Sequence, residues 1–234
     1  MLECDGRFGE TPFIRDREEA IAFVRGQPAR SPSLLWAIDC LSRDLAPFVR
    51  PLCILLTAPE QPIARGFPAY KLKVKGLSVA ATEHWLARVH KLEPHALLRL
   101  DANRSWQLED VLRLQTPPLD YFEEPCADLH ALAARSSLPL AVDETYHPNT
   151  PFRIVYKPSV HGPLPARAVT LSGHYETGIG TWHIAQLSDP EVPVGLDTYS
   201  RISQDALQHR LHIRDGHIAS ASPALDWSRL CRIA

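Results

Sequence analysis

Short apolar stretches recur along the middle of the chain, and each of them ends at a charged or turn-forming residue. Stretches of this length, made of residues that suit strands and separated by helical patterns, are typical of βαβ units. They therefore predict successive parallel strands. The expected strands cover residues 51–57, 69–74, 97–103, 121–125, 140–144, 153–158, 168–172 and 193–197.

Helical periodicity lies between most of these strands and also in the first 46 residues. Ser31, followed by a proline and an apolar periodic run, predicts a helix start. One buried stripe is expected on that helix, made of Leu34, Leu35, Ile38, Leu41 and Leu45. The expected helices cover residues 16–25, 31–45, 79–92, 108–115, 128–135, 177–187 and 204–209.

The segments 145–152 and 159–167 do not fit this rhythm, because each is short and contains two prolines. A crossover with a full helix needs at least about 10 to 12 residues, and prolines interrupt helices. The strands on either side are therefore expected to be joined with little or no outer helix. Their apolar outer faces would be left uncovered, which predicts a homodimer through this helix-poor flank.

These elements predict an α/β protein with a TIM-type (β/α)8-like barrel at residues 47–210 and shortened outer helices. Residues 1–46 form a separate α-rich piece, and a hairpin at 211–219 is expected to pack back on it with the rest of 211–234. The chain has 234 residues and is 45% hydrophobic, so it can bury a sizeable core. It is nevertheless short for a barrel, which takes about 250 residues.

Composition excludes several classes of partner. The formal charge is −2 and no block of like charges occurs, which argues against nucleic acid and against an anionic membrane surface. The apolar runs, such as residues 52–56, are far shorter than the roughly 20 residues that cross a bilayer. Five cysteines without a Cys-x-x-Cys pair, and a start unlike a secretory signal, predict reduced thiols in a cytoplasmic protein.

Charged residues gather at the expected strand ends. In a barrel of parallel strands the carboxyl ends meet at one mouth, where such barrels keep their chemistry. The charged groups expected there are Lys73, Asp101, one of Glu123 and Glu124, Asp143 and Lys157. Strand parity leaves both glutamates open. Three carboxylates around one space repel one another unless a cation lies between them, and oxygen ligands suit a hard ion such as Mg²⁺.

Other polar residues share faces with these groups. Side chains alternate along a strand, so Lys71 lies on the face of Lys73, while Arg99 and Asn103 lie on the inward face with Asp101. An arginine inside a barrel is costly unless it is paired. Arg99 is therefore expected to hold a carboxylate, from either the protein or a substrate.

The order of these motifs resembles the enolase superfamily, in its muconate-lactonising-enzyme subgroup and there the o-succinylbenzoate synthases. The matching motifs are Tyr70-Lys-Leu-Lys, Leu98-Arg-Leu-Asp-Ala-Asn-Arg-Ser-Trp106, Phe122-Glu-Glu-Pro-Cys126, Val142-Asp-Glu-Thr145, Lys157-Pro-Ser and Val194-Gly-Leu-Asp-Thr198. They cover roughly residues 6 to 198 in order.

The resemblance implies a site built from residues with separate tasks. It selects Asp101, Glu124 and Asp143 as ligands of Mg²⁺, with Mn²⁺ as a substitute, and Lys73 and Lys157 as acid/base groups. It implies a small carboxylate substrate, contacted by Lys71, Arg99, Asn103, Ser172, Gly173 and Gly195. It also implies that residues 1–46 are the last parts of a truncated N-terminal α+β capping domain.

For the reaction, the resemblance implies a carbon–oxygen lyase. The substrate would be 2-succinyl-6-hydroxy-2,4-cyclohexadiene-1-carboxylate of menaquinone biosynthesis, which is dehydrated to 2-succinylbenzoate through an enediolate. Lys73 would take the proton next to the carboxylate, and Lys157 would stabilise the ring by a cation–π contact. Racemisation of N-succinylamino acids, epimerisation of dipeptides and muconate lactonisation use the same residues and stay open. An alternative of another class is a non-catalytic, degenerate barrel.

Overall fold

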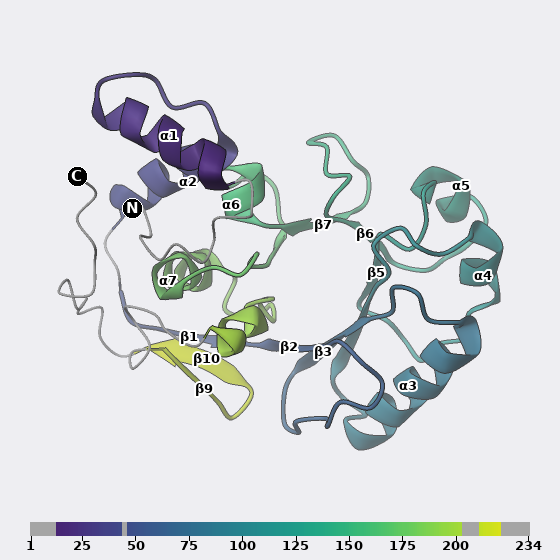
Figure 1. Cartoon of the computed structure of the whole chain (residues 1–234). Coiled ribbons are helices and arrows are strands. Elements are labelled where there is room, and N and C mark those ends of the chain that lie inside the picture. The colour runs from purple at the N-terminus through teal and green to yellow at the C-terminus, as the bar shows by residue number, and fades with distance from the viewer. Residues whose placement is uncertain (1–12, 44–45, 203–210, 221–234) are drawn as a thin grey trace.

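A parallel sheet of seven strands forms the centre of the computed structural model, which describes residues 13–43, 46–202 and 211–220 (Figure 1). Each strand pairs with the next one along the chain. The strands are β2 (Cys53–Leu56), β3 (Ala69–Lys73), β4 (Leu97–Asp101), β5 (Tyr121–Glu123), β6 (Leu140–Val142), β7 (Arg153–Tyr156) and β8 (Thr170–Leu171). All seven lie where strands were expected, and all are shorter than expected.

Residues 193–195 link the two edges of this sheet. Val194 forms a parallel bridge with Leu52, beside β2, and Gly195 forms one with Ser172, beside β8. Four backbone hydrogen bonds of 2.9 to 3.0 Å accompany the two bridges. The strand expected at 193–197 is thus present as two bridge residues, which close the sheet on itself. It is followed by the 3-10 helix η1 (Asp197–Arg201).

Three helices lie together on the outside of one half of the sheet, at the right of Figure 1. They are α3 (Val79–Leu92), α4 (Leu108–Arg113) and α5 (Leu129–Ala133). The side chain of Ser78 accepts a hydrogen bond of 3.2 Å from the N–H of Ala81 and so caps α3, which has the bounds that the sequence predicts. Trp85, Leu86 and Val89 of α3 are fully buried and join the main core.

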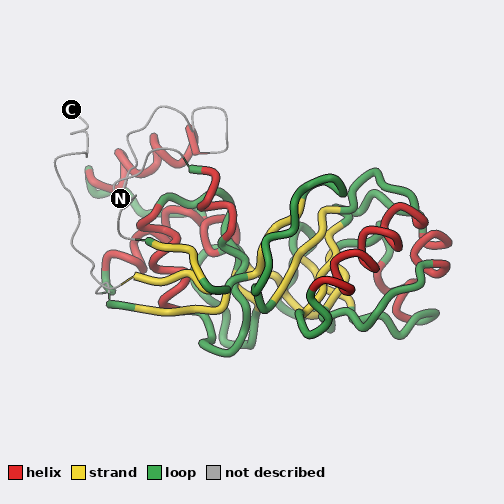
Figure 2. The backbone as a smooth tube through the Cα atoms, turned by 90° about the horizontal axis from the view of Figure 1, so that it is seen from below, coloured by secondary structure: helices red, strands yellow, loops and turns green. Residues whose placement is uncertain are grey.

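The other half of the sheet carries less helix in its crossovers. Residues 144–152 connect β6 and β7 without a helix, and β7 leads to β8 through only α6 (Pro158–His161). The expected shortening is confirmed. After β8 comes α7 (Gly178–Leu187), which is almost entirely buried. Figure 2 shows the strands running between two groups of helices at the two ends of the molecule.

Two N-terminal helices, α1 (Phe13–Val24) and α2 (Pro32–Leu41), lie beside this second half. Contacts join α2 to α1 and to α6. Pro32 of α2 lies so near Gly162 that a Cβ added to this glycine would be 3.6 Å from the Cα of Pro32. The chain therefore covers part of the helix-poor flank itself, and the homodimer stays a prediction. None of the helices in the described ranges is long and apolar enough to cross a membrane.

The stripe predicted for α2 is partly wrong. Ser31 caps the helix, with its side chain accepting from the N–H of Leu34 at 3.4 Å, and Leu34 is buried as expected. Leu35, in contrast, is 39% exposed, while Trp36 is buried. The reason is that α2 lies between α1 and α6 and is covered on more than one side. Leu45 and the side chain of Leu41 are not among the parts of the chain that the structure describes.

A small antiparallel sheet joins the segment just before β2 to a hairpin late in the chain. The hairpin of β9 (His212–Arg214) and β10 (His217–Ser220) pairs with β1 (Phe48–Pro51), in the order β1-β10-β9. The expected hairpin is confirmed, and it pairs with the chain just before the barrel. Residues 221–234 and the helix expected at 204–209 lie outside the described residues. The domain boundaries and the truncated capping domain stay predictions.

Candidate active site

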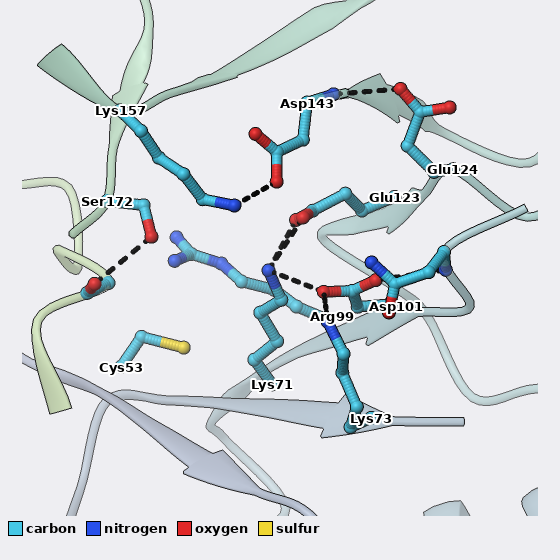
Figure 3. A network of polar contacts seen from close by, with 12 residues as sticks. Cys53, Lys71, Lys73, Arg99, Asp101, Glu123, Glu124, Asp143, Lys157 and Ser172 are labelled. Carbon is cyan, nitrogen blue, oxygen red and sulfur yellow. Dashed lines mark hydrogen bonds and ion pairs between the residues drawn. The ribbon is translucent and has the colours of Figure 1, made fainter. Parts of the chain in front are cut away.

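Six charged side chains meet at the carboxyl ends of β3 to β7 (Figure 3). We call them the ring, and they are Lys71, Lys73, Asp101, Glu123, Asp143 and Lys157. The register sets three of them side by side, because Lys73 is paired with Asp101 and Asp101 with Glu123. Asp143 and Lys157 directly follow β6 and β7. The predicted meeting of charges from successive strand ends is therefore present in the structure.

Lys71 lies at the centre of the buried part of the ring. Its Nζ is 2.7 Å from each carboxylate oxygen of Glu123 and 3.0 Å from Oδ2 of Asp101. Although burial opposes the charged form, these two carboxylates raise the pKa of Lys71 well above its ordinary value. Lys71 is therefore a fixed ammonium group, suited to balance charge and unsuited to accept a proton.

The buried carboxylates respond differently to this arrangement. Burial opposes ionisation of Asp101, but Lys71 and Lys73 prevail and lower its pKa to about 2. Burial raises the pKa of Glu123 to about 8, and although Lys71 opposes this, Asp101 and Asp143 act in the same direction as burial. Negative charge is thus crowded at Glu123, where a further cation would relieve it.

The two outer lysines are more accessible. Nζ of Lys73 lies 2.8 Å from Oδ2 of Asp101, and its side chain is 35% exposed, against 13% for Lys71. Lys157 forms an ion pair with Asp143 and is 18% exposed. Of the three lysines, Lys73 is therefore the one that a substrate reaches most easily.

The structure does not bring Glu124 into the ring, and Glu123 takes its place. Oε1 of Glu124 accepts hydrogen bonds from the backbone N–H groups of Asp143 (3.0 Å) and Thr145 (2.8 Å) and from the Thr145 hydroxyl (2.6 Å). Figure 3 shows its side chain beside the end of β6, away from the lysines. The register of β5 is the physical reason, because it places Glu123 opposite Asp101.

Arg99 holds a carboxylate of the protein, which was one of the two alternatives. Its Nε lies 2.8 Å from Oδ2 of Asp120, and its Nη1 donates to the carbonyl oxygen of Pro193 at 2.8 Å. The guanidinium carbon also lies 5.0 Å from the ring centroid of Tyr121. With only 1% exposure, Arg99 is a structural residue here, and its assignment as a substrate contact is corrected.

We expect Asp120→Ala to lower the free energy of unfolding by about 3 to 5 kcal/mol, because it leaves the buried Arg99 guanidinium without its carboxylate. Urea unfolding followed by circular dichroism measures this change. Glu109→Ala is the control, since it removes only an exposed pair of 3.8 Å with Arg135 and should change stability little. Equal stabilities for the two variants would contradict the structural role of Arg99.

The remaining predicted substrate contacts lie in two places. Asn103 is partly exposed, and its Nδ2 donates to Oε1 of Glu144 at 2.5 Å. Ser172, Gly173 and Gly195 lie together where residues 193–195 meet β8, and the Ser172 hydroxyl donates to the carbonyl oxygen of Gly195 at 3.1 Å. Their contact with a substrate stays a prediction.

Sequence reasoning left the choice between Glu123 and Glu124 to the resemblance, and it did not single out Thr145. Glu123 ends β5 as Asp101 ends β4, so counting each strand from its end could have selected it. Thr145 carried no signal, because its role depends on the side chain of Glu124, which is distant in sequence.

The donor set of the ring fits a hard divalent cation. Asp101, Glu123 and Asp143 come from three consecutive strands and offer only oxygen, which suits magnesium. Each of them is paired with a lysine. Across residues 13–43, 46–202 and 211–220, no three His, Cys, Asp or Glu side chains stand close enough to hold a metal ion. Ion binding therefore requires these carboxylates to turn from their lysines toward one another.

Residues 57–157 match the model of the family described as enolase C-terminal domain-like. No curated protein matches the chain. Solved structures of similar fold include an isomerase from Streptomyces coelicolor A3(2), with 21% identity and a TM-score of 0.60. That alignment covers 77% of this chain and 64% of the isomerase, so the chain spans less than two thirds of that protein.

Two further structures are similar in fold. An o-succinylbenzoate synthase from Thermosynechococcus elongatus BP-1, complexed with Mg in the active site, has 22% identity and a TM-score of 0.59, covering 76% of this chain and 74% of that one. A dipeptide epimerase from Methylococcus capsulatus, complexed with an Mg ion, has 19% identity and a TM-score of 0.57, covering 83% and 70%. At these identities the likeness shows the fold. Through the family match over residues 57–157 and this shared fold, the chain is similar to enolase C-terminal domain-like proteins.

Proposed function

We propose that this chain is an enzyme that removes a proton next to a carboxylate, and that its reaction is the dehydration of 2-succinyl-6-hydroxy-2,4-cyclohexadiene-1-carboxylate to 2-succinylbenzoate. The observation that carries the proposal is the ring, in which two accessible lysines from β3 and from the end of β7 flank three carboxylates. Similarity in fold to an o-succinylbenzoate synthase supports the choice of reaction.

Asp101, Glu123 and Asp143 are the proposed magnesium ligands, with manganese as a substitute, so Glu123 replaces Glu124 in this role. Magnesium held by these carboxylates would act as a Lewis acid toward the substrate carboxylate and take up charge that develops as the proton leaves. Lys71 adds a positive charge beside that of the metal ion, since its ammonium group is fixed between Asp101 and Glu123.

Lys73 is the proposed base, because it is the most exposed lysine of the ring. Once Asp101 has turned from Lys73 toward the ion, the lysine in its neutral amine form takes the ring proton next to the carboxylate and leaves an enediolate. The resulting Lys73 ammonium then gives a proton to the hydroxyl group, which departs as water when the C–O bond breaks. The electron pair of the former C–H bond forms the last double bond of the aromatic product. The lysine thus ends the cycle as the free amine.

Lys157 stands across the ring from Lys73 and is held by Asp143. It is also the N-cap residue of α6, and its backbone N–H donates to Nδ1 of His161 at 3.1 Å, which fixes the start of that helix. An ammonium group in this place can stabilise the substrate ring by a cation–π contact. Its position depends on α6 as well as on β7.

Racemisation of N-succinylamino acids or epimerisation of dipeptides is the second candidate, and the same two lysines favour it. With a lysine on either side of a substrate, one can remove the α-proton while the other delivers a proton to the opposite face. The fold similarity to a dipeptide epimerase supports this alternative.

Proton NMR distinguishes the two reactions. With the cyclohexadiene substrate and Mg²⁺ we expect aromatic signals of 2-succinylbenzoate to appear at least tenfold faster than with heat-denatured protein. In D₂O, loss of the α-proton signal of an N-succinylamino acid or a dipeptide would instead reveal the second candidate. If neither conversion exceeds the denatured control, the non-catalytic barrel becomes the better description.

A further inference from the structure

Glu124 holds the loop that carries Asp143 through hydrogen bonds. A single oxygen of Glu124, Oε1, accepts three hydrogen bonds, from the N–H groups of Asp143 and Thr145 and from the Thr145 hydroxyl, at 3.0, 2.8 and 2.6 Å. Asp143 directly follows β6, at the point where the chain leaves the sheet without a helix to support it. The three bonds therefore act on the segment whose orientation decides where the Asp143 carboxylate lies.

The second oxygen of Glu124 is in a different situation. Glu124 is fully buried, and Oε2 has no hydrogen-bond partner among the described residues. In the described part of the chain no lysine or arginine pairs with either oxygen of this residue. A buried carboxylate with one bare oxygen is costly. Within the residues that the structure describes, the polar task of this carboxylate is therefore to accept the three bonds from the loop.

We propose that Glu124 is a positioning residue that orients Asp143 for the divalent cation, while its neighbour Glu123 is itself a ligand. The inference rests on the proposed function, because the cation site is what the positioning serves. The backbone of Glu124 has φ of 43°, which turns the chain after β5 and lets two successive glutamates point to different places. In Figure 3 one glutamate enters the ring and the other reaches the end of β6.

Two substitutions separate position from charge. Glu124→Gln keeps an accepting oxygen at the same distance but removes the charge, and Glu124→Asp keeps the charge but draws the oxygen back from the loop. Partners that orient metal ligands typically change metal affinity 10- to 100-fold. We therefore expect Glu124→Asp to bind Mn²⁺ about 10- to 100-fold more weakly than the unmodified chain, and Glu124→Gln to bind it within about threefold.

Isothermal titration of the full chain with Mn²⁺ gives these affinities, and melting temperatures in EDTA report the fold separately. A purely structural role would lower the melting temperatures and leave the affinities equal. Equal affinity for Glu124→Asp, or a loss confined to Glu124→Gln, overturns the inference.

If Glu124→Asp does not fold, Thr145→Val tests the same contact. We expect about 2- to 10-fold weaker binding for the loss of one hydrogen bond, and unchanged binding would contradict the inference. Absence of Mn²⁺ binding by the unmodified chain would instead overturn the proposed function itself.

Discussion

Lys73→Ala is expected to lower kcat for the dehydration at least about 100-fold, which is the lower end of the effect of a general base. Lys73 is the most exposed lysine of the ring and is held 2.8 Å from Asp101, so it can reach a substrate without unfolding any element. Lys71 cannot replace it, since that lysine is fixed by two carboxylates. The loss should appear in kcat because the proton transfer belongs to the chemical step.

The matched control is Lys75→Ala, which removes an exposed lysine two residues further along the chain and should leave the rate unchanged. Steady-state rates from the appearance of 2-succinylbenzoate give both comparisons. Activity of Lys73→Ala within a factor of two of the unmodified chain would rule out Lys73 as the base.

Exhaustive removal of divalent ions with EDTA is expected to abolish turnover, and an excess of Mg²⁺ should restore it. Lewis-acid stabilisation contributes several kcal/mol, which corresponds to a loss of more than about 100-fold in rate. The fold should survive this treatment, because three lysine ammonium groups already balance the three carboxylates of the ring. Circular dichroism of the chelated chain checks this second expectation.

The control is EDTA that has been saturated with Mg²⁺ beforehand, because this chelator can no longer remove divalent ions from the protein. Turnover that persists at the same rate after complete chelation would eliminate the divalent cation from the mechanism. A lost rate together with a lost circular dichroism signal would show that the ion is needed for folding, against the charge balance described above.

Elements with a local signal were predictable from the sequence. The bounds of α3 follow from a periodic apolar pattern, and this pattern lies within the helix itself. The seven strands follow from apolar stretches that end at charged or turn residues. The gathering of lysines and carboxylates at one end of the sheet follows in turn, because parallel strands present the same ends to the same side.

Properties that depend on a partner distant in sequence were not predictable. Glu123 and Glu124 are identical in type and adjacent, so only the pairing of Asp101 with Glu123 across two strands separates them. The charge of Arg99 predicted a buried pair, but its partners are Asp120, just before β5, and the carbonyl group of Pro193. The stripe on α2 failed for the same reason, since the faces it buries depend on two other helices.

The join at residues 193–195 closes the barrel with few hydrogen bonds. Opening it breaks four backbone hydrogen bonds and leaves the ladder of seven strands intact. The join is also tight, because a Cβ added at Gly195 would lie 2.7 Å from Oγ of Ser172. A side chain in place of the Gly195 hydrogen would therefore push this short segment away from β8, with no strand in the sheet changing its neighbour.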